Sequence, residues 1–380
     1  ASLEAERLPI QFHHFQPQII RSCNCGCNLM TKAAVPRLPF FVSARAQPVL
    51  SPLHLNFHIS IRQGVGLEKR LSRTLSVAVR ASSDPRGKSR SLSPLEFESP
   101  VGLLLSQILQ THPHLLPAAI DQQLENLKTE QEESSSSQDV LYRRIAEVKQ
   151  KERRRVLEEI IYSLVVQKFI DNNILMIPKL PPASSDPAGR IDFWPNQEQK
   201  LESVHSQEAF EMILSHLSII LGEREVGPLE TIVQISNIKL GKLYAASVMY
   251  GYFLRRVDER YQLELRMNTK TSMVSREGEE EDDKTCRLRS YVMYLDGDTL
   301  QRYATIRSKE AISLIEKQTQ ALFGRPDIKI ADDGSLDASN DEVVSLTFSG
   351  LTMLVLEAVA FGSFLWDAEC YVESKFQFLS

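Results

Sequence analysis

Glu357 is the residue of this sequence whose type and position best suit chemistry. It lies near the middle of the stretch Val343 to Trp366, which is otherwise apolar or carries only small polar residues. Burial in such a segment raises the pKa of a carboxyl group, and a raised pKa suits a general acid or base. A buried acid is more commonly satisfied by a neighbouring Arg or Tyr, and we favour that structural role over catalysis. Glu357 is therefore the candidate functional carboxylate.

The other polar clusters do not match established catalytic or metal-binding patterns. Cys23, Cys25 and Cys27 lack the two-residue gap and the second ligand pair of a structural zinc site. The Asp-rich stretch 332–342 lacks the alternating oxygen ligands of a calcium loop. Beyond residue 81 there is no Gly-rich phosphate loop, nucleophile elbow or dinucleotide fingerprint. We therefore expect no cofactor and no metal. An enzyme without a short motif stays open as the alternative.

Charge argues against nucleic-acid binding. Residues 1–81 carry ten Lys and Arg and three acids, which leaves 34 basic and 46 acidic residues beyond them, a formal charge of −12. An acidic body repels phosphate backbones unless it has a local basic patch. The run Lys149 to Arg155 is basic, but Glu residues interleave with it, and consecutive helical residues point in different directions. We predict a solvated helix face there and no nucleic-acid partner.

Apolar residues recur at helical spacing along most of the chain after residue 81, which predicts an all-α protein. Ser99-Pro100 suits a helix start, and Gly251 leaves room for a second helix to approach closely. The predicted organisation is a leader at 1–81, an N-terminal helical domain at 82–177, a Pro-rich linker at 178–204, a helical repeat copy at 205–268, an acidic disordered loop at 269–286 and a second helical repeat copy at 287–380.

The two repeat copies rest on an internal sequence match. The helix around Glu208 to Gly222 matches the helix around Glu310 to Gly324, and Val248 to Leu254 matches Val359 to Leu365. The offset grows by nine residues between the two matches, which indicates an insertion in the loop at 332–342. A fainter third copy starts near Ile160. We predict a soluble bundle of helical hairpins, repeated two to three times.

The apolar stretch Val343 to Trp366 is long enough to cross a bilayer. Its repeat counterpart, around Tyr244 to Leu254, is closely flanked by basic residues, which is typical of a helix in a water-soluble domain. An acid near the middle, Glu357, would add to the cost of insertion. We therefore predict a core helix and no membrane insertion.

The leader predicts an organelle address. It has few acids, scattered Arg, several Ser and Pro, and no long apolar core of a secretory signal. The stretch 75–83 resembles a stromal processing site, so we expect cleavage near Ala81. Composition separates chloroplast leaders from mitochondrial leaders poorly. A family resemblance, carried by later segments of the chain, makes a chloroplast the first choice, and a mitochondrion is the runner-up.

Several segments of the chain resemble one plant family. They are Ser93 to Gly102, Leu243 to Asp258, Tyr291 to Ala304 and Phe361 to Asp367. Together these segments are similar to the UV-B-induced chloroplastic proteins, whose common domain is of unknown function and numbered 760. The resemblance implies residence in a plastid and a role linked to light or stress, and it supplies no catalytic residues.

We expect a non-enzymatic chloroplast stromal protein that responds to light, UV-B or stress and acts through protein–protein contacts. The outer faces of its helical pairs would meet a plastid protein partner. The alternative is a plastid enzyme with a pocket between the helical repeats, around Glu357 or Tyr250. A closed cavity with converging polar groups would favour the enzyme, and an exposed apolar surface would favour the binding protein.

Overall fold

The computed structural model describes residues 60–61, 92–133, 140–180, 190–221, 230–271, 287–325, 329–330, 336–337 and 341–376. The cleavage site at Ala81 and most of the predicted leader lie outside these residues. The three clustered cysteines, residues 272–286 of the predicted acidic loop and most of the stretch 332–342 also lie outside them. The transit peptide therefore stays a prediction.

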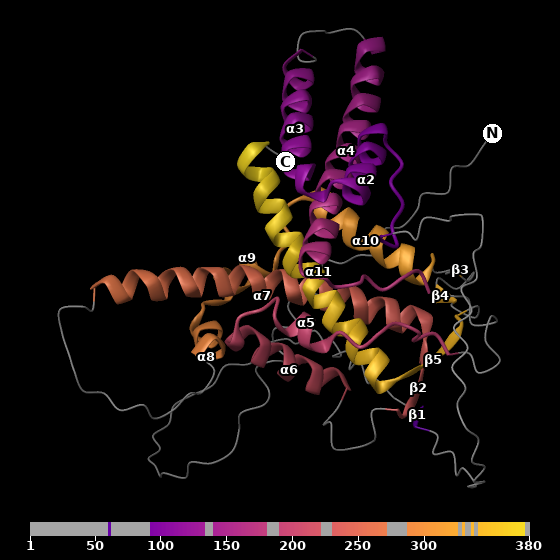
Figure 1. The fold of residues 1–380 in the computed structure, drawn as a ribbon, viewed down its shortest axis with the longest axis vertical. Coiled ribbons are helices and arrows are strands. Elements are labelled where there is room, and N and C mark those ends of the chain that lie inside the picture. Colours follow the sequence, from indigo (N-terminus) through magenta and orange to yellow (C-terminus); the bar gives the residue numbers. More distant parts are fainter. Residues whose placement is uncertain are drawn as a thin grey trace, which may run out of the picture.

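Most of the described residues are helical, as the sequence predicts (Figure 1). The N-terminal part contains α2 (Pro100–Thr111), a short 3-10 turn (Pro113–Leu115), α3 (Leu116–Glu133) and α4 (Val140–Asp171). The first of these helices begins as predicted, because the Ser99 side chain accepts a hydrogen bond of 2.9 Å from the Gly102 amide. In Figure 1 the outer ends of α3 and α4 project together from the body of the molecule.

The remaining helices build the body. They are α5 (Glu198–Glu202), α6 (Gln207–Leu221), α7 (Asn237–Thr271), α8 (Arg287–Tyr294), α9 (Gly297–Ala304), α10 (Lys309–Phe323) and α11 (Phe348–Lys375).

Five short strands correct the all-α prediction. They are β1 (Ser60–Ile61), β2 (Ile232–Ser236), β3 (Lys329–Ile330), β4 (Leu336–Asp337) and β5 (Val343–Thr347). β3 pairs with β4, while β1, β2 and β5 form an antiparallel sheet in the order β1-β2-β5. The strand β5 was interpreted as the first turn of the last helix, because a short apolar run fits a buried strand and a helix equally well.

The helix α11 forms the centre of the core. It is the one helix in the described part of the chain that is long and apolar enough to cross a membrane, with a mean hydropathy of 1.7 over its most apolar window. In the structure 89% of that window is buried inside the protein. The helices α7 and α4 pack against it, and Figure 1 shows α11 crossing α7 in the middle of the molecule. Its apolar surface is thus covered by other parts of the same chain.

Two glycines set the distance between α7 and α11. A Cβ atom on Gly251 would lie 2.0 Å from the carbonyl oxygen of Val359, and one on Gly362 would lie 1.9 Å from the carbonyl oxygen of Val248. The Ser363 hydroxyl sits at the same crossing and donates to the Gly251 carbonyl at 3.2 Å. The two backbones are therefore in direct contact, as the sequence predicts for Gly251.

Candidate functional site

Glu357 lies in the middle of α11 and is 2% exposed. Neither of its carboxylate oxygens has a hydrogen-bond partner. Burial raises the pKa of Glu357 to about 7, even though the nearby Tyr244 hydroxyl and Ile177 backbone amide both lower it. These two groups act on the carboxylate without meeting hydrogen-bond geometry. The prediction that a helix this apolar buries Glu357 is correct, whereas its functional role remains untested.

A line of hydrogen bonds between buried side chains begins next to Glu357. Gln318 on α10 donates from Nε2 to the Tyr244 hydroxyl on α7 at 3.4 Å. The Tyr162 hydroxyl on α4 donates to Gln318 Oε1 at 3.1 Å and accepts from the Leu95 amide at 3.3 Å. We call Tyr162, Gln318 and Tyr244 together the buried polar chain. All three side chains are at most 1% exposed. Burial raises the pKa of both tyrosines, so their hydroxyls stay protonated near neutral pH.

The far end of this line is residues 92–99, which we call the strap because they lie against α4. Glu159 on α4 accepts hydrogen bonds from the Glu98 amide at 2.9 Å and from the Ser99 amide at 3.1 Å. The Phe97 ring packs on Tyr162 with 5.7 Å between ring centroids. The strap thus has a fixed end at residues 98–99 and a second attachment through Tyr162.

A half-open pocket of about 260 Å³ lies between the strap, α2 and α4. The enzyme alternative expected a pocket around Glu357 or Tyr250 instead. The lining of the observed pocket is mixed, with six apolar and four polar or charged residues: Leu92, Ser93, Leu95, Glu96, Phe97, Leu103, Ser106, Leu109, Gln110 and Val166.

Tyr250, the other residue named for a pocket, is a core contact. It is 2% exposed, and its hydroxyl donates to the Met212 carbonyl at 3.2 Å. Its ring stacks on His216 with centroids 4.1 Å apart and an angle of 12° between the planes. Burial lowers the pKa of His216 to about 4, so that imidazole is neutral near pH 7. The pair therefore joins α6 to α7 through packing.

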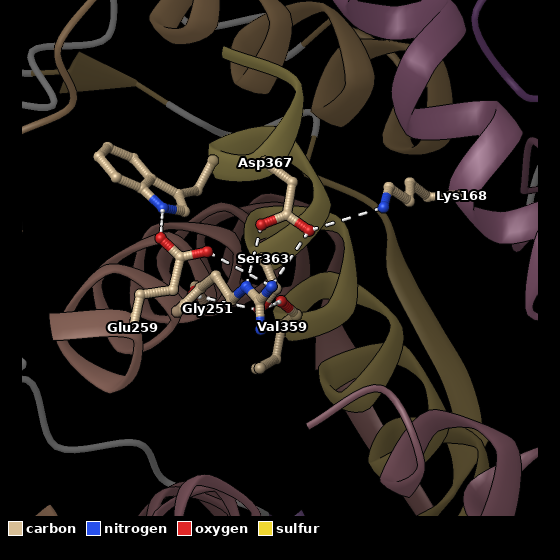
Figure 2. A network of polar contacts seen from close by, with 8 residues as sticks. Lys168, Gly251, Glu259, Val359, Ser363 and Asp367 are labelled. Atoms are coloured by element: carbon tan, nitrogen blue, oxygen red, sulfur yellow. Dashed lines mark hydrogen bonds and ion pairs between the residues drawn. The ribbon is translucent and has the colours of Figure 1, made fainter. Parts of the chain in front are cut away.

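A cluster of charged side chains lies beside the point where α7 crosses α11 (Figure 2). Arg255 contacts Asp367 at 2.9 Å and Glu259 at 3.4 Å. Lys168 of α4 lies 4.0 Å from Asp367, and the Trp366 indole donates to Glu259 at 2.8 Å. Asp367 and Glu259 each face a cation, so the cluster ties α4, α7 and α11 together.

Sequence reasoning missed the buried polar chain. Gln318 follows Leu314 and precedes Leu322 at spacings of four residues, so it lies on the apolar face of α10. A polar residue on an apolar helix face is the signal that could have identified it. No group of three His, Cys, Asp or Glu residues within the described ranges is arranged to hold a metal ion.

Comparison with known proteins identifies the family. Residues 140–267 match the family described as "Protein of unknown function (DUF760)". A UV-B-induced chloroplastic protein of Arabidopsis thaliana is 48% identical over 351 residues, which cover 80% of this chain and 83% of that relative. No solved structure matches the chain. The chain belongs to the plant family of UV-B-induced chloroplastic proteins that carry this domain of unknown function.

Proposed function

We propose that this protein is a chloroplast stromal protein that responds to UV-B, light or stress and acts by binding another plastid protein. The name of its relative supports the plastid address and the link to UV-B. The burial of Glu357, Tyr244 and Tyr250 supports binding over catalysis, because a substrate needs access to the groups that act on it.

We further propose that the fold is a duplicated unit whose two copies pack on each other. Support comes from pairs of equivalent positions that lie 111 residues apart, such as the first residues of β2 and β5 and the first residues of α7 and α11. In the antiparallel register Gln234 pairs with Ser345, its own equivalent. Gly251 and Gly362 are equivalent as well, and each contacts the other's helix. A duplicated unit of this kind presents two related outer faces to a partner.

The observation that carries the binding proposal is an apolar surface on α8 and the free end of α7. In Figure 1 the C-terminal part of α7 extends well beyond the crossing with α11. Leu263, Leu265 and Met267 are exposed there, and Met293 and Tyr294 are exposed on α8, which packs against α7. Tyr294 is 90% exposed. Leu263 and Met267 are four residues apart and share one face of α7. With Met293 and Tyr294 on the adjoining α8 they form the surface that we propose for partner binding, since exposed apolar side chains that gather in one place are typical of an interaction surface.

The stromal address is tested by import into isolated chloroplasts. We expect the full chain to be shortened on import and recovered in the soluble stromal fraction. Retention of the shortened chain on thylakoids through an alkaline carbonate wash would refute both the stromal address and the core role of α11. Recovery from mitochondria alone would move the address to the runner-up organelle.

The binding surface is tested by capturing partners from illuminated chloroplasts with three forms of the imported protein. The test form carries Met267→Glu and Tyr294→Glu, and the control form carries Val148→Glu, which changes an exposed valine on α4. We expect one partner to be retained by the wild type and the control and lost from the test form. Equal capture by all three forms would reject this surface. The absence of any reproducible partner, together with a small molecule that raises the melting temperature, would favour the enzyme alternative.

A further inference from the structure

We propose that Glu357 is a proton-binding switch, and that the strap of residues 92–99 responds to it through the buried polar chain. The switch would change the wall of the pocket beside α2 when Glu357 gains or loses its proton.

The first step is the state of Glu357 itself. A buried carboxylate without hydrogen bonds is costly when ionised and much less costly when protonated. Burial raises the pKa of Glu357 to about 7, so both states are populated near neutral pH. Glu159, another acid of the core, differs in that its carboxylate accepts hydrogen bonds from two backbone amides.

The second step is the set of groups that face Glu357. Tyr244 from α7 and the Ile177 amide, which follows α4, are the groups that lower its pKa, and its charge in turn raises the pKa of Tyr162 on α4. The adjoining side chain on α10, Gln318, carries no charge. Within the described part of the chain, no Lys, Arg or His is among the groups that shift the pKa of Glu357. Ionised Glu357 must therefore accept a hydrogen bond from a tyrosine hydroxyl or from a backbone amide.

The Tyr244 hydroxyl is the side-chain donor within reach. In the structure it accepts from Gln318 at 3.4 Å, which leaves its own hydrogen free to turn towards Glu357. Movement of Tyr244 towards the carboxylate lengthens a hydrogen bond that is already at the long end of the normal range. The three hydrogen bonds from Tyr244 through Gln318 and Tyr162 to Leu95 measure 3.4, 3.1 and 3.3 Å. All three are long, so a small movement of one side chain is enough to weaken them.

The strap is the part that can respond. Its far end is held by Glu159, whereas Leu95 depends on Tyr162 for its amide hydrogen bond. A shift of Tyr162 therefore acts on residues 92–97 and leaves the start of α2 in place. Ser93, Leu95 and Phe97 of the strap all line the pocket, so the proton on Glu357 controls the shape of that pocket.

The test follows two signals in the full-length chain between pH 5 and 9. Infrared spectroscopy reports the C=O stretch of protonated Glu357, and hydrogen exchange, corrected for the intrinsic pH dependence of exchange, reports the protection of the Leu95 amide. We expect the carboxyl band to disappear with a midpoint near pH 7 and the protection of Leu95 to fall several-fold over the same range.

Two variants separate the switch from a structural role. In Glu357→Gln, which mimics the protonated state, the band is absent and the protection of Leu95 should not change with pH. In Tyr244→Phe the band should still titrate near neutral pH, while the response of Leu95 should be lost. A band that titrates near pH 4.5 in the wild type would overturn the switch. A response of Leu95 that persists in Tyr244→Phe would overturn the transmission path. Should Glu357→Gln fail to fold, the wild type and Tyr244→Phe decide the question alone.

Discussion

The replacement of Gly251 by Ala should strongly destabilise the protein although it adds only one methyl group. The new Cβ atom would lie 2.0 Å from the Val359 carbonyl oxygen, 2.7 Å from the Val359 carbonyl carbon and 2.8 Å from its Cα. All three atoms belong to the backbone of α11, so no side chain can rotate away. The helices α7 and α11 must separate to accommodate the methyl group.

The size of the loss follows from that separation. An ordinary contact begins at 3.4 Å, so the 2.0 Å distance has to grow by 1.4 Å. A gap of even 0.5–1 Å removes about a quarter to a half of the dispersion attraction across an interface. Overpacking against backbone therefore costs about 3 kcal/mol or more, and the better helix propensity of Ala returns about 1 kcal/mol. The net loss of about 2 kcal/mol should lower the melting temperature by roughly 4–8 °C.

Gly241 in the same helix provides the matched control. A Cβ atom there would meet side chains of α10 at 3.5–3.6 Å, which is ordinary contact. Gly241→Ala should therefore keep or raise the stability by about 0.5–1 kcal/mol through helix propensity. Thermal melts followed by circular dichroism at 222 nm would compare the two variants. Equal melting temperatures for Gly251→Ala and Gly241→Ala would refute the view that the backbones touch at this crossing.

Three further changes test the contacts around the core. Thr347→Ala removes the cap of α11 and should lower the unfolding free energy by about 1–2 kcal/mol, whereas Thr347→Ser should keep it; urea unfolding measures both. Burial raises the pKa of Asp192, but the hydrogen bonds and charge of Arg190 and the hydrogen bonds of Thr347 lower it by more. The free energy that Asp192 contributes to folding is therefore fully present above pH 3.8, its pKa in the unfolded chain. That contribution is lost as the pH falls through the lower pKa of Asp192 in the folded protein. Asp192→Asn should remove that dependence in acid titrations, and an unchanged acid limb would contradict it. Trp366→Phe removes the bond to Glu259 and should cost about 1 kcal/mol, read from the urea midpoint.

The sequence predicted those parts of the fold that depend on neighbouring residues. The start of α2 at Ser99-Pro100 is determined by local capping and appears as expected. The burial of α11 and the close approach at Gly251 also follow from the composition of a single segment. Each of these features is decided within a few residues of the chain.

The strands β2 and β5 could not be predicted in the same way. Each has only five residues, and each is stabilised by a partner more than 100 residues away in the chain. Five residues before a helix, three of them apolar in each strand, are too few for a periodicity that distinguishes a strand from a helical turn. The pairing of such strands depends on the tertiary fold, which local patterns do not contain.

The candidate site was predicted only at one residue. Glu357 stood out because it is a charge in an apolar segment, and the sequence suggested an Arg or a Tyr as its neighbour. The nearby hydroxyl belongs to Tyr244, and no Arg contributes to its environment. Tyr162, Gln318 and Tyr244 lie on three different helices, so only the packing of those helices brings them into one line.

The position of α11 in the chain has a consequence for biogenesis. The segment around which every other layer assembles is the last of the described helices to emerge from a ribosome or to pass N-terminus first through an import channel. Until it arrives, the faces of α4 and α7 that pack on α11 are uncovered, so the incomplete chain exposes apolar surface that is prone to aggregation. A stop codon shortly before Phe348 would therefore remove the helix at the centre of the core, whereas a nick in a surface loop would leave that helix in place.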